Sequence, residues 1–332
     1  MTNENILQNF NPFIGKHCET TATGSLLKQL GIELSESMLF GIGEGLGYVF
    51  WNMKIMNFPF IGGRIKPDIL TENICRNLHL KLDVTETSST KKAWKNVTKH
   101  LDNGKAVGLK LDYYHLEYFK VKIHFAGHYV AMYGYDNDFA YLVDTNGQEH
   151  SKTSLKSLEL ARNEKGAMSS KNRSYIIAKT NKTYDLKKVI QNAIYNNAID
   201  FLNPPIKNIG YKGILKTSTE IKKWFLSSKD IKTDFQTTAM IMENGGTGGS
   251  LFRNLYRDFL KESAKILGSK EIKLVAEEYT EIAILWKKVS DLLYKVGETE
   301  NIRYIKEASE ILIDLSEREK TAMEKLKHIC KQ

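Results

Sequence analysis

The sequence is poor in cysteine and proline, with three cysteines and five prolines among 332 residues. Three cysteines form neither a disulfide framework nor a metal-binding motif, which excludes a disulfide-stapled scaffold and favours a reducing compartment. Two of them, Cys75 and Cys330, are expected to be chemically inert. The first ten residues, MTNENILQNF, lack the basic and apolar segments of a secretory signal. Because no apolar run is long enough to cross a bilayer, we expect a cytoplasmic protein without a membrane partner.

The overall composition is that of a soluble globular protein. Hydrophobic residues make up 42% and charged residues 26% of a chain that is long enough for two domains. The formal net charge of +9 favours an acidic partner. No basic block with interleaved aromatic residues indicates nucleic-acid binding. Acidic carrier proteins are therefore candidate partners, and nucleic acids are not.

A cysteine stands at the predicted start of a helix, Cys18 in the segment KHCETTATGSLLKQLG. Apolar residues from Ala22 to Leu30 are spaced for one face of a helix, and Gly31 is a typical stop. At a helix N-terminus, free N–H groups and the helix dipole favour a thiolate and can donate to a developing oxyanion. A lone cysteine before an apolar helix is more often a small buried residue, so the role of Cys18 depends on its partners.

The later segment AGHYVAMYGYDNDFAYLVDTNG predicts a hairpin with strands at His128–Tyr135 and Phe139–Asp144. Antiparallel pairing brings the start of the first strand beside the end of the second, and hence His128 toward Asp144. The register decides whether the two share a face. A three-residue loop would place them on the same face, and a two-residue loop would turn Asp144 away. The register stays open, and Asn146 is a second candidate for orienting the imidazole.

A thiol, an imidazole and a carboxylate are the components of nucleophilic catalysis. The order cysteine, histidine, aspartate is that of papain-like folds, so we expect acyl transfer through a thioester by Cys18, His128 and Asp144. His124 is a rival base that would share a face with His128 if the strand began that early. The aromatic residues within 113–119 are expected to be core, or else to line an apolar channel that excludes water.

Two domains are expected, 1–182 with mixed helix and strand signals and 183–332 with helical spacing. Strand-like segments at 105–114 and 173–180 flank the hairpin, which predicts an α+β fold with an antiparallel sheet packed on helices. The second domain is expected to be mostly α-helical and to cover the active-site cleft. Its predicted helices lie near 185–202, 216–227, 250–267, 270–296 and 301–328.

Two glycine-rich segments interrupt this pattern. LFGIGEGLGYVFW, residues 39–51, lacks the Gly-Lys-Ser/Thr of a phosphate loop. We favour a tight loop with close backbone packing over a wall of the cleft beside Cys18. The second, ENGGTGGSLFRNLYRDFLKES, opens a helix. It is either an anion site completed by Arg253 and Arg257 or an ordinary helix start.

These segments resemble a known family. HCETTATGSLLKQLGIELSESMLFGIGEGLGYVFW, then GGR, then GHYVAMYGYDNDFAYLVDTNG resemble the N-terminal domain of the butirosin biosynthesis protein H family. GGTGGSLFRNLYRDFLKESAKIL is similar to the helical domain that usually follows. The resemblance implies a papain-like, cysteine-protease-like fold and an acyltransferase of antibiotic biosynthesis. Such an enzyme moves an acyl group from an acyl or peptidyl carrier-protein thioester to a small-molecule amine; a closthioamide-type amide synthetase is a related possibility.

The resemblance also implies roles for individual residues. Cys18 would be the nucleophile, His128 the base and Asp144 its orienter. No cofactor or metal is implied, since phosphopantetheine arrives on the carrier protein. The oxyanion glutamine has no obvious counterpart upstream of Cys18, where Gln8 and Asn11 are nearest. The alternatives are a cysteine peptidase or amidase and a non-catalytic protease-like binding module. The acyl donor, the amine acceptor and the oligomeric state cannot be predicted.

Overall fold

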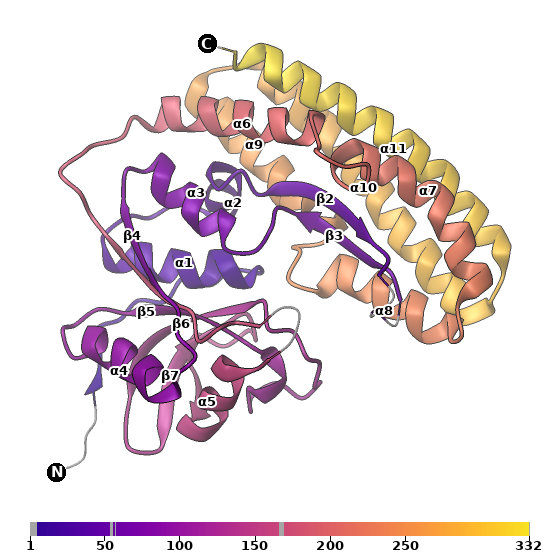
Figure 1. Ribbon diagram of the computed structural model, residues 1–332. Helices are drawn as coiled ribbons and strands as arrows, with labels where there is room; N and C mark the ends of the chain where they lie inside the picture. Colours follow the sequence, from indigo (N-terminus) through magenta and orange to yellow (C-terminus); the bar gives the residue numbers. More distant parts are fainter. Residues whose placement is uncertain (1–4, 54–55, 57, 166–168, 332) are drawn as a thin grey trace. The chain divides into compact units, whose positions relative to one another are not determined.

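The computed structural model describes residues 5–53, 56, 58–165 and 169–331 (Figure 1). The chain forms two compact units, residues 1–39 with 67–184 and residues 40–66 with 185–332. The expected division at 182–183 leaves residues 40–66 with the first domain, whereas their contacts place them with the C-terminal helices. Within the described part of the chain, no helix has the length and apolar character needed to span a membrane.

The first unit is built on an antiparallel sheet with the strand order β4-β9-β5-β6-β7-β8, and β1 pairs with β6. The prediction of an α+β region with an antiparallel sheet is therefore confirmed. The strands β1 and β8 and the short, charged edge strand β4 were not predicted. The strands are β1 (Asn5–Ile6), β4 (Lys81–Thr85), β5 (Val107–Leu111), β6 (His128–Tyr135), β7 (Phe139–Val143), β8 (Ser151–Ser154) and β9 (Ser174–Ala178).

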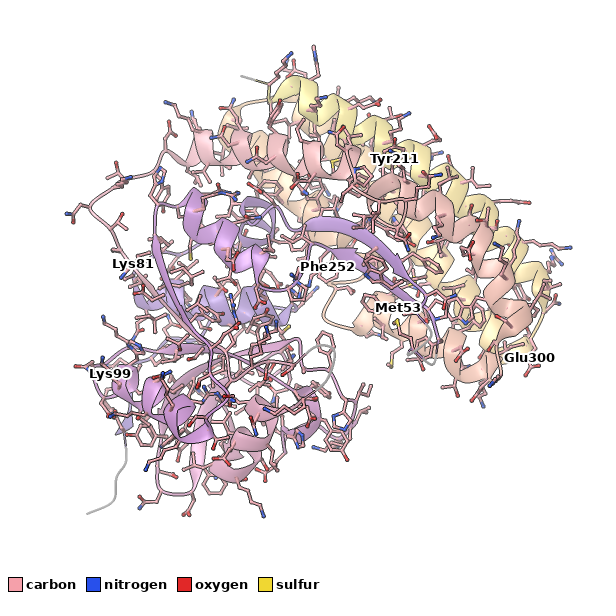
Figure 2. The ribbon with its side chains drawn as sticks, in the orientation of Figure 1. Met53, Lys81, Lys99, Tyr211, Phe252 and Glu300 are labelled. Carbon is pink, nitrogen blue, oxygen red and sulfur yellow. The ribbon has the colours of Figure 1, made fainter. Side chains whose placement is uncertain are left out.

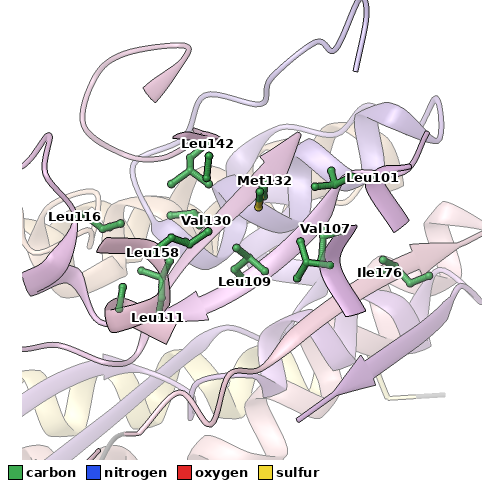
Figure 3. Close-up of a cluster of buried hydrophobic side chains, with 13 residues drawn as sticks. Leu101, Val107, Leu109, Leu111, Leu116, Val130, Met132, Leu142, Leu158 and Ile176 are labelled. Atoms are coloured by element: carbon green, nitrogen blue, oxygen red, sulfur yellow. The ribbon is translucent and has the colours of Figure 1, made fainter. Parts of the chain in front are cut away.

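Helices cover both faces of this sheet. One face is covered by α1 (Cys18–Gln29), and the other by α4 (Thr90–Leu101) and α5 (Leu155–Asn163) (Figure 1). Alternate residues of β5, β6 and β7 fill the space toward α4 and α5 (Figure 3). Each large apolar side chain buried there contributes about 1.5–3 kcal/mol. The cluster consists of Val97, Leu101, Val107, Leu109, Leu111, Leu116, Val130, Met132, Ala140, Leu142, Leu158, Ala161 and Ile176.

The register of the hairpin is set by a bulge. The pairing of β6 with β7 shifts by one residue at Tyr133. Beyond it Ala131 pairs with Val143, so the next residue, Asp144, falls opposite the position two residues after His128. Residues two apart on a strand point to the same face. Without the bulge, Asp144 would be one step out of register and would point away from His128.

The second unit is a helical array that includes one hairpin. The expected helices are all present, and α8, rich in β-branched threonine, was not predicted. The helix α2 (Glu36–Ile42) leads from the first unit into the hairpin of β2 (Leu46–Trp51) and β3 (Phe60–Arg64). The next helix, α3 (Ile69–Asn77), belongs to the first unit. The remaining helices of the second unit are α6 (Leu186–Leu202), α7 (Gly210–Ser227), α8 (Ile231–Asn244), α9 (Arg253–Leu267), α10 (Lys270–Thr299) and α11 (Ile302–Ile329).

The first glycine-rich segment was expected to be a tight loop, but it forms the end of α2 and the strand β2 around a short turn at 43–45, and only its close backbone packing is as expected. A Cβ atom at Gly41 would lie 2.0 Å from the ring of Phe259 on α9, so only glycine fits there. Beside it, Phe40 stacks on Phe252, labelled in Figure 2, with ring centroids 5.4 Å apart. The segment thus fixes the start of α9.

The anion-site interpretation of the second glycine-rich segment is wrong for Arg253. The Arg253 guanidinium is fully buried and forms a two-pronged ion pair with Glu319 of α11, at 3.0 and 2.8 Å. It also donates to the Leu251 carbonyl at 2.8 Å and lies over the ring of Trp286 on α10, whose Nε1 donates to Glu319. Its charge therefore joins three helices and is not available to a ligand.

Breaking this pair is expected to destabilise the protein strongly. Arg253→Met leaves the Glu319 carboxylate buried without its partner, which costs about 3–5 kcal/mol. The double variant Arg253→Met/Glu319→Leu should lose less, because neither charge remains. Urea unfolding measures both. Arg318→Met is the matched control, because Arg318 pairs at the surface with Asp314 and is 51% exposed, and it should cost about 0–1 kcal/mol. An equal loss in the single and double variants would contradict this account.

Candidate active site

Cys18 is the first residue of α1 and is 7% exposed. The turn before it is held by Glu36, whose Oε1 accepts hydrogen bonds from the N–H groups of Lys16 and His17, both at 2.8 Å. The same oxygen accepts from Thr20 Oγ1 at 2.9 Å. One carboxylate therefore satisfies the two N–H groups that precede α1 and holds the turn that leads into Cys18.

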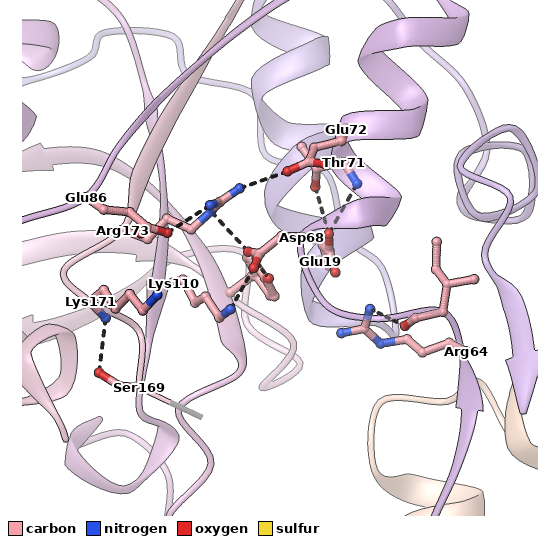
Figure 4. A network of polar contacts seen from close by, with 12 residues as sticks. Glu19, Arg64, Asp68, Thr71, Glu72, Glu86, Lys110, Ser169, Lys171 and Arg173 are labelled. Atoms are coloured by element: carbon pink, nitrogen blue, oxygen red, sulfur yellow. Dashed lines mark hydrogen bonds and ion pairs between the residues drawn. The ribbon is translucent and has the colours of Figure 1, made fainter. Parts of the chain in front are cut away.

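The helix that carries Cys18 is also held to α3 by a buried side chain of its own, Glu19. Glu19 is completely buried and accepts hydrogen bonds from the N–H and hydroxyl of Thr71 on α3, at 3.2 and 3.0 Å (Figure 4). Asp68, before α3, accepts from Lys110 at 2.8 Å and pairs with Arg173 at 3.1 Å. These contacts join α1, α3 and the sheet.

His128 and Asp144 lie in direct contact. Nε2 of His128 is 2.8 Å from Oδ1 and 2.9 Å from Oδ2 of Asp144, and the Asp144 side chain has no solvent exposure. His128 also interacts with the Cys18 side chain. Because Nε2 is directed at Asp144, Nδ1 is the nitrogen left for Cys18. The structure thus places His128 against Asp144 and brings Cys18 within electrostatic influence of the imidazole.

Asp144 takes further hydrogen bonds from residues that sequence reasoning did not assign to it. The hydroxyl of Tyr118 donates to Oδ2 at 2.6 Å. The N–H and the hydroxyl of Thr145 donate to Oδ1 at 2.6 and 3.2 Å. A buried carboxylate held by this many donors has its hydrogen-bonding capacity satisfied, which fixes its orientation.

Two aromatic rings pack against the imidazole. The rings of Tyr113 and Phe119 meet His128 edge to face, with centroids 5.5 and 5.9 Å away, and stack on each other at 4.0 Å. Phe119 and Tyr118 also pack against the core cluster. The aromatic segment 113–119 is therefore partly core, as expected, but it also shapes the surroundings of His128.

The charge state of His128 reflects opposing influences. Burial alone would lower its pKa, but the Asp144 carboxylate and then Cys18 outweigh it and raise the pKa from 6.5 to about 10. The imidazole is therefore charged in the folded protein at neutral pH.

The rival candidates lie elsewhere. β6 begins at His128, so His124 falls in the loop before it, where it bonds to Asp112 and stacks on Tyr114. Asn146 donates to Ser151 at 2.7 Å. Of the two upstream amides, Asn11 accepts from Lys28 at 2.9 Å and Gln8 donates weakly to the carbonyl of Ile6 at 3.4 Å. None of these contacts supports a second base or an oxyanion amide.

The other two cysteines differ from Cys18 in their surroundings. All three cysteines are free and buried, so the difference lies in the charged groups around them. Burial raises the pKa of the Cys75 thiol to about 12, with a smaller effect of Glu72, and raises that of Cys330 to about 11. They remain neutral thiols near neutral pH, as expected from their lack of a motif.

The fold is an α+β region with an antiparallel sheet packed on helices, followed by a mostly helical region, and in its site His128 contacts Asp144. Residues 17–145 match the family described as butirosin biosynthesis protein H, N-terminal. Residues 156–326 match a domain of unknown function (DUF4872). The chain belongs to this two-domain family, as the resemblance implied. No curated protein matches the chain. The first match places it in an antibiotic-biosynthesis family and suggests a butirosin-type acyltransferase.

Replacing the carboxylate should change the titration of His128. In Asp144→Asn the largest attraction is lost while burial remains, so the His128 pKa should fall well below its wild-type value of about 10. NMR of the ring protons measures it, and Asp138→Asn in the same hairpin is the matched control. Because the His128 pKa is higher in the folded protein, its protonation stabilises the fold. This stabilisation is fully present below pH 6.5 and is lost as the pH rises to about 10. Wild type should thus lose more stability across this range than Asp144→Asn; equal titration curves would contradict the assignment.

Iodoacetamide should distinguish the three cysteines. We expect one alkylation near neutral pH, at Cys18, because the thiolate is the reactive form and Cys75 and Cys330 are buried neutral thiols. Peptide mass spectrometry locates the label. Cys18→Ala should remain unlabelled, and Cys75→Ala should be labelled like wild type. Labelling at Cys75 or Cys330 in the folded protein, or none at all, would contradict this account.

Proposed function

We propose that this protein is an acyltransferase that forms amide bonds in natural-product biosynthesis, with a papain-like triad of Cys18, His128 and Asp144. The observation that carries the proposal is the contact of His128 Nε2 with both oxygens of Asp144, on an imidazole that also interacts with Cys18. The family match over residues 17–145 supports the reaction class.

In the first half-reaction, the Cys18 thiolate attacks the carbonyl carbon of an acyl thioester held on a carrier-protein phosphopantetheine. A new carbon–sulfur bond to Cys18 forms and the bond to the carrier sulfur breaks. His128, as imidazolium, gives its proton to the departing thiolate. The N–H groups at the start of α1 would stabilise the oxyanion that forms in between.

In the second half-reaction, an amine attacks the acyl-enzyme. His128, now neutral, takes a proton from the amine nitrogen, the amide forms and Cys18 leaves as a thiolate. The imidazolium–thiolate pair is thereby restored. Asp144 keeps the imidazole oriented in both steps. Water would compete for the same intermediate, and the rings of Tyr113 and Phe119 against His128 limit its access from that side.

The proposed partners follow from this chemistry. The acyl donor is an acyl or peptidyl carrier protein, and the net charge of +9 suits an acidic partner of this kind. The acceptor is a small-molecule amine. Phosphopantetheine belongs to the donor, so the reaction draws all its catalytic groups from the chain itself.

The decisive measurement is intact mass after mixing the protein with a panel of acyl-N-acetylcysteamine thioesters. We expect one acyl adduct on wild type and on the control Cys75→Ala, and none on Cys18→Ala. His128→Ala should form it about 10²–10⁴-fold more slowly, the usual contribution of acid–base catalysis.

The discharge of the adduct then identifies the reaction. Loss of the acyl group only when amines are added, with an amide as product, supports the proposal. Rapid loss to water alone would instead identify a hydrolase. No adduct with either small thioesters or loaded carrier proteins would overturn covalent catalysis and favour a binding module.

A further inference from the structure

Two histidines and a glutamate meet at a place that the acyl-transfer chemistry does not use. His115 ends the short 3-10 helix η1 (Tyr113–His115), His124 lies in the loop before β6, and Glu164 follows α5. One ligand-type atom from each lies within 4.8 Å of the others, and Nε2 of His115 is 2.8 Å from Oε2 of Glu164. Ligands about 2.0–2.2 Å from a tetrahedral zinc ion lie about 3.4 Å apart. The cluster is thus within small side-chain adjustments of that geometry.

A buried carboxylate stands behind one of these histidines. Nδ1 of His124 is 3.1 Å from Oδ2 of Asp112, whose side chain is 2% exposed. Oδ1 of Asp112 is held by the N–H groups of Tyr114 and Phe125, at 2.8 and 3.1 Å. A carboxylate bonded to the far nitrogen of a histidine is the usual outer support of a metal ligand, because it fixes the tautomer and the ring orientation.

The orientation of His124 is restricted further by stacking. The ring of Tyr114 lies flat on the imidazole, with centroids 4.0 Å apart and an interplanar angle of 9°. Because Nδ1 is directed at Asp112, Nε2 is the nitrogen that remains for an ion. The His124 side chain is 60% exposed, so an ion has access from solvent and water can complete its coordination.

We propose that His115, His124 and Glu164 form a binding site for a divalent transition-metal ion, foremost zinc, with Asp112 as the outer support of His124. Two imidazoles and one carboxylate suit zinc and its neighbours in the transition series, whereas magnesium and calcium prefer ligands that are all oxygen. Three protein ligands leave one tetrahedral position for water.

The bound ion would act as a clasp, meaning that it would hold together the two ends of the loop segment 115–124 beside His128. His115 and His124 bracket the stretch that contains Tyr118 and Phe119, which contact Asp144 and His128 respectively. Glu164 ties the same point to the end of α5. The bound metal therefore fixes both ends of this stretch, and its role is to position those contacts.

The test must exclude the thiolate, because Cys18 and His128 together also offer zinc a sulfur and a nitrogen. We therefore use the full chain with Cys18→Ala, stripped with EDTA, and titrate zinc by calorimetry and cobalt(II) by visible absorption. We expect one site per chain, with cobalt d–d bands and no thiolate band. Adding His115→Ala or His124→Ala should abolish it, and adding Asp112→Asn should weaken it about 10–100-fold.

Two further variants keep the result interpretable. Adding Glu164→Gln preserves size and a hydrogen-bonding group toward His115 but removes the anionic ligand, so affinity should fall while circular dichroism stays unchanged. Adding His328→Ala, an exposed histidine on α11, should leave binding unaltered. Binding that persists after both His115 and His124 are replaced, or that is absent once Cys18 is replaced, would overturn the proposal and leave the cluster as simple ion pairs.

The clasp itself is tested by limited trypsin digestion. Lys120 and Lys122 are exposed within the bracketed stretch. In the Cys18→Ala protein, zinc should slow cleavage after these lysines, and it should not do so when His115→Ala is added. Equal cleavage with and without bound zinc would show that the ion does not hold this segment.

Discussion

A carboxylate without solvent contact must take all its hydrogen bonds from the protein, and the side chain of Asp144 is such a group. Its donors come from three places: His128 on the neighbouring strand, Thr145 next in the chain, and Tyr118 in the loop before β6. Satisfying this one charge therefore fixes the strand pairing, the loop and the imidazole together. The raised pKa of His128 is a direct consequence, because the charge that burial would remove is retained by Asp144.

The identity of these residues could be predicted from the sequence, but their geometry could not. A cysteine before an amphipathic helix and a histidine and aspartate at the two ends of a hairpin are local patterns. The register depends on a turn of four residues between the paired Tyr135 and Ala140, together with a one-residue bulge at Tyr133. The turn alone would place Asp144 opposite Ala131 and on the other face, and the bulge moves it opposite Val130, onto the face of His128. Bulges have no strong sequence signal, so a two- or three-residue loop was the natural expectation.

In the helical unit, the periodic pattern predicted most helices because each buries one apolar face. Arg253 shows where such local reasoning ends. A glycine-rich loop followed by arginines is a reasonable anion site until a partner from far along the chain is known. Glu319 supplies that partner, and with Trp286 it places a fully buried charge among three helices. The same argument explains why Glu36 was missed: its effect on Cys18 acts through backbone N–H groups 19 and 20 residues away.

The loop before β6 links the two polar clusters of the first unit. At its beginning, Asp112 holds backbone N–H groups at both ends of the loop, those of Tyr114 and Phe125. Between them, Tyr118 reaches Asp144. Leu116 of this loop belongs to the buried core cluster and Tyr118 and Phe119 pack against it, while these polar contacts hold the ends of the loop. Any interaction that holds its ends also holds the hydroxyl that steadies Asp144, and through Asp144 the imidazole that serves Cys18. The chemistry proposed for Cys18 thus depends on a segment that no catalytic motif would single out.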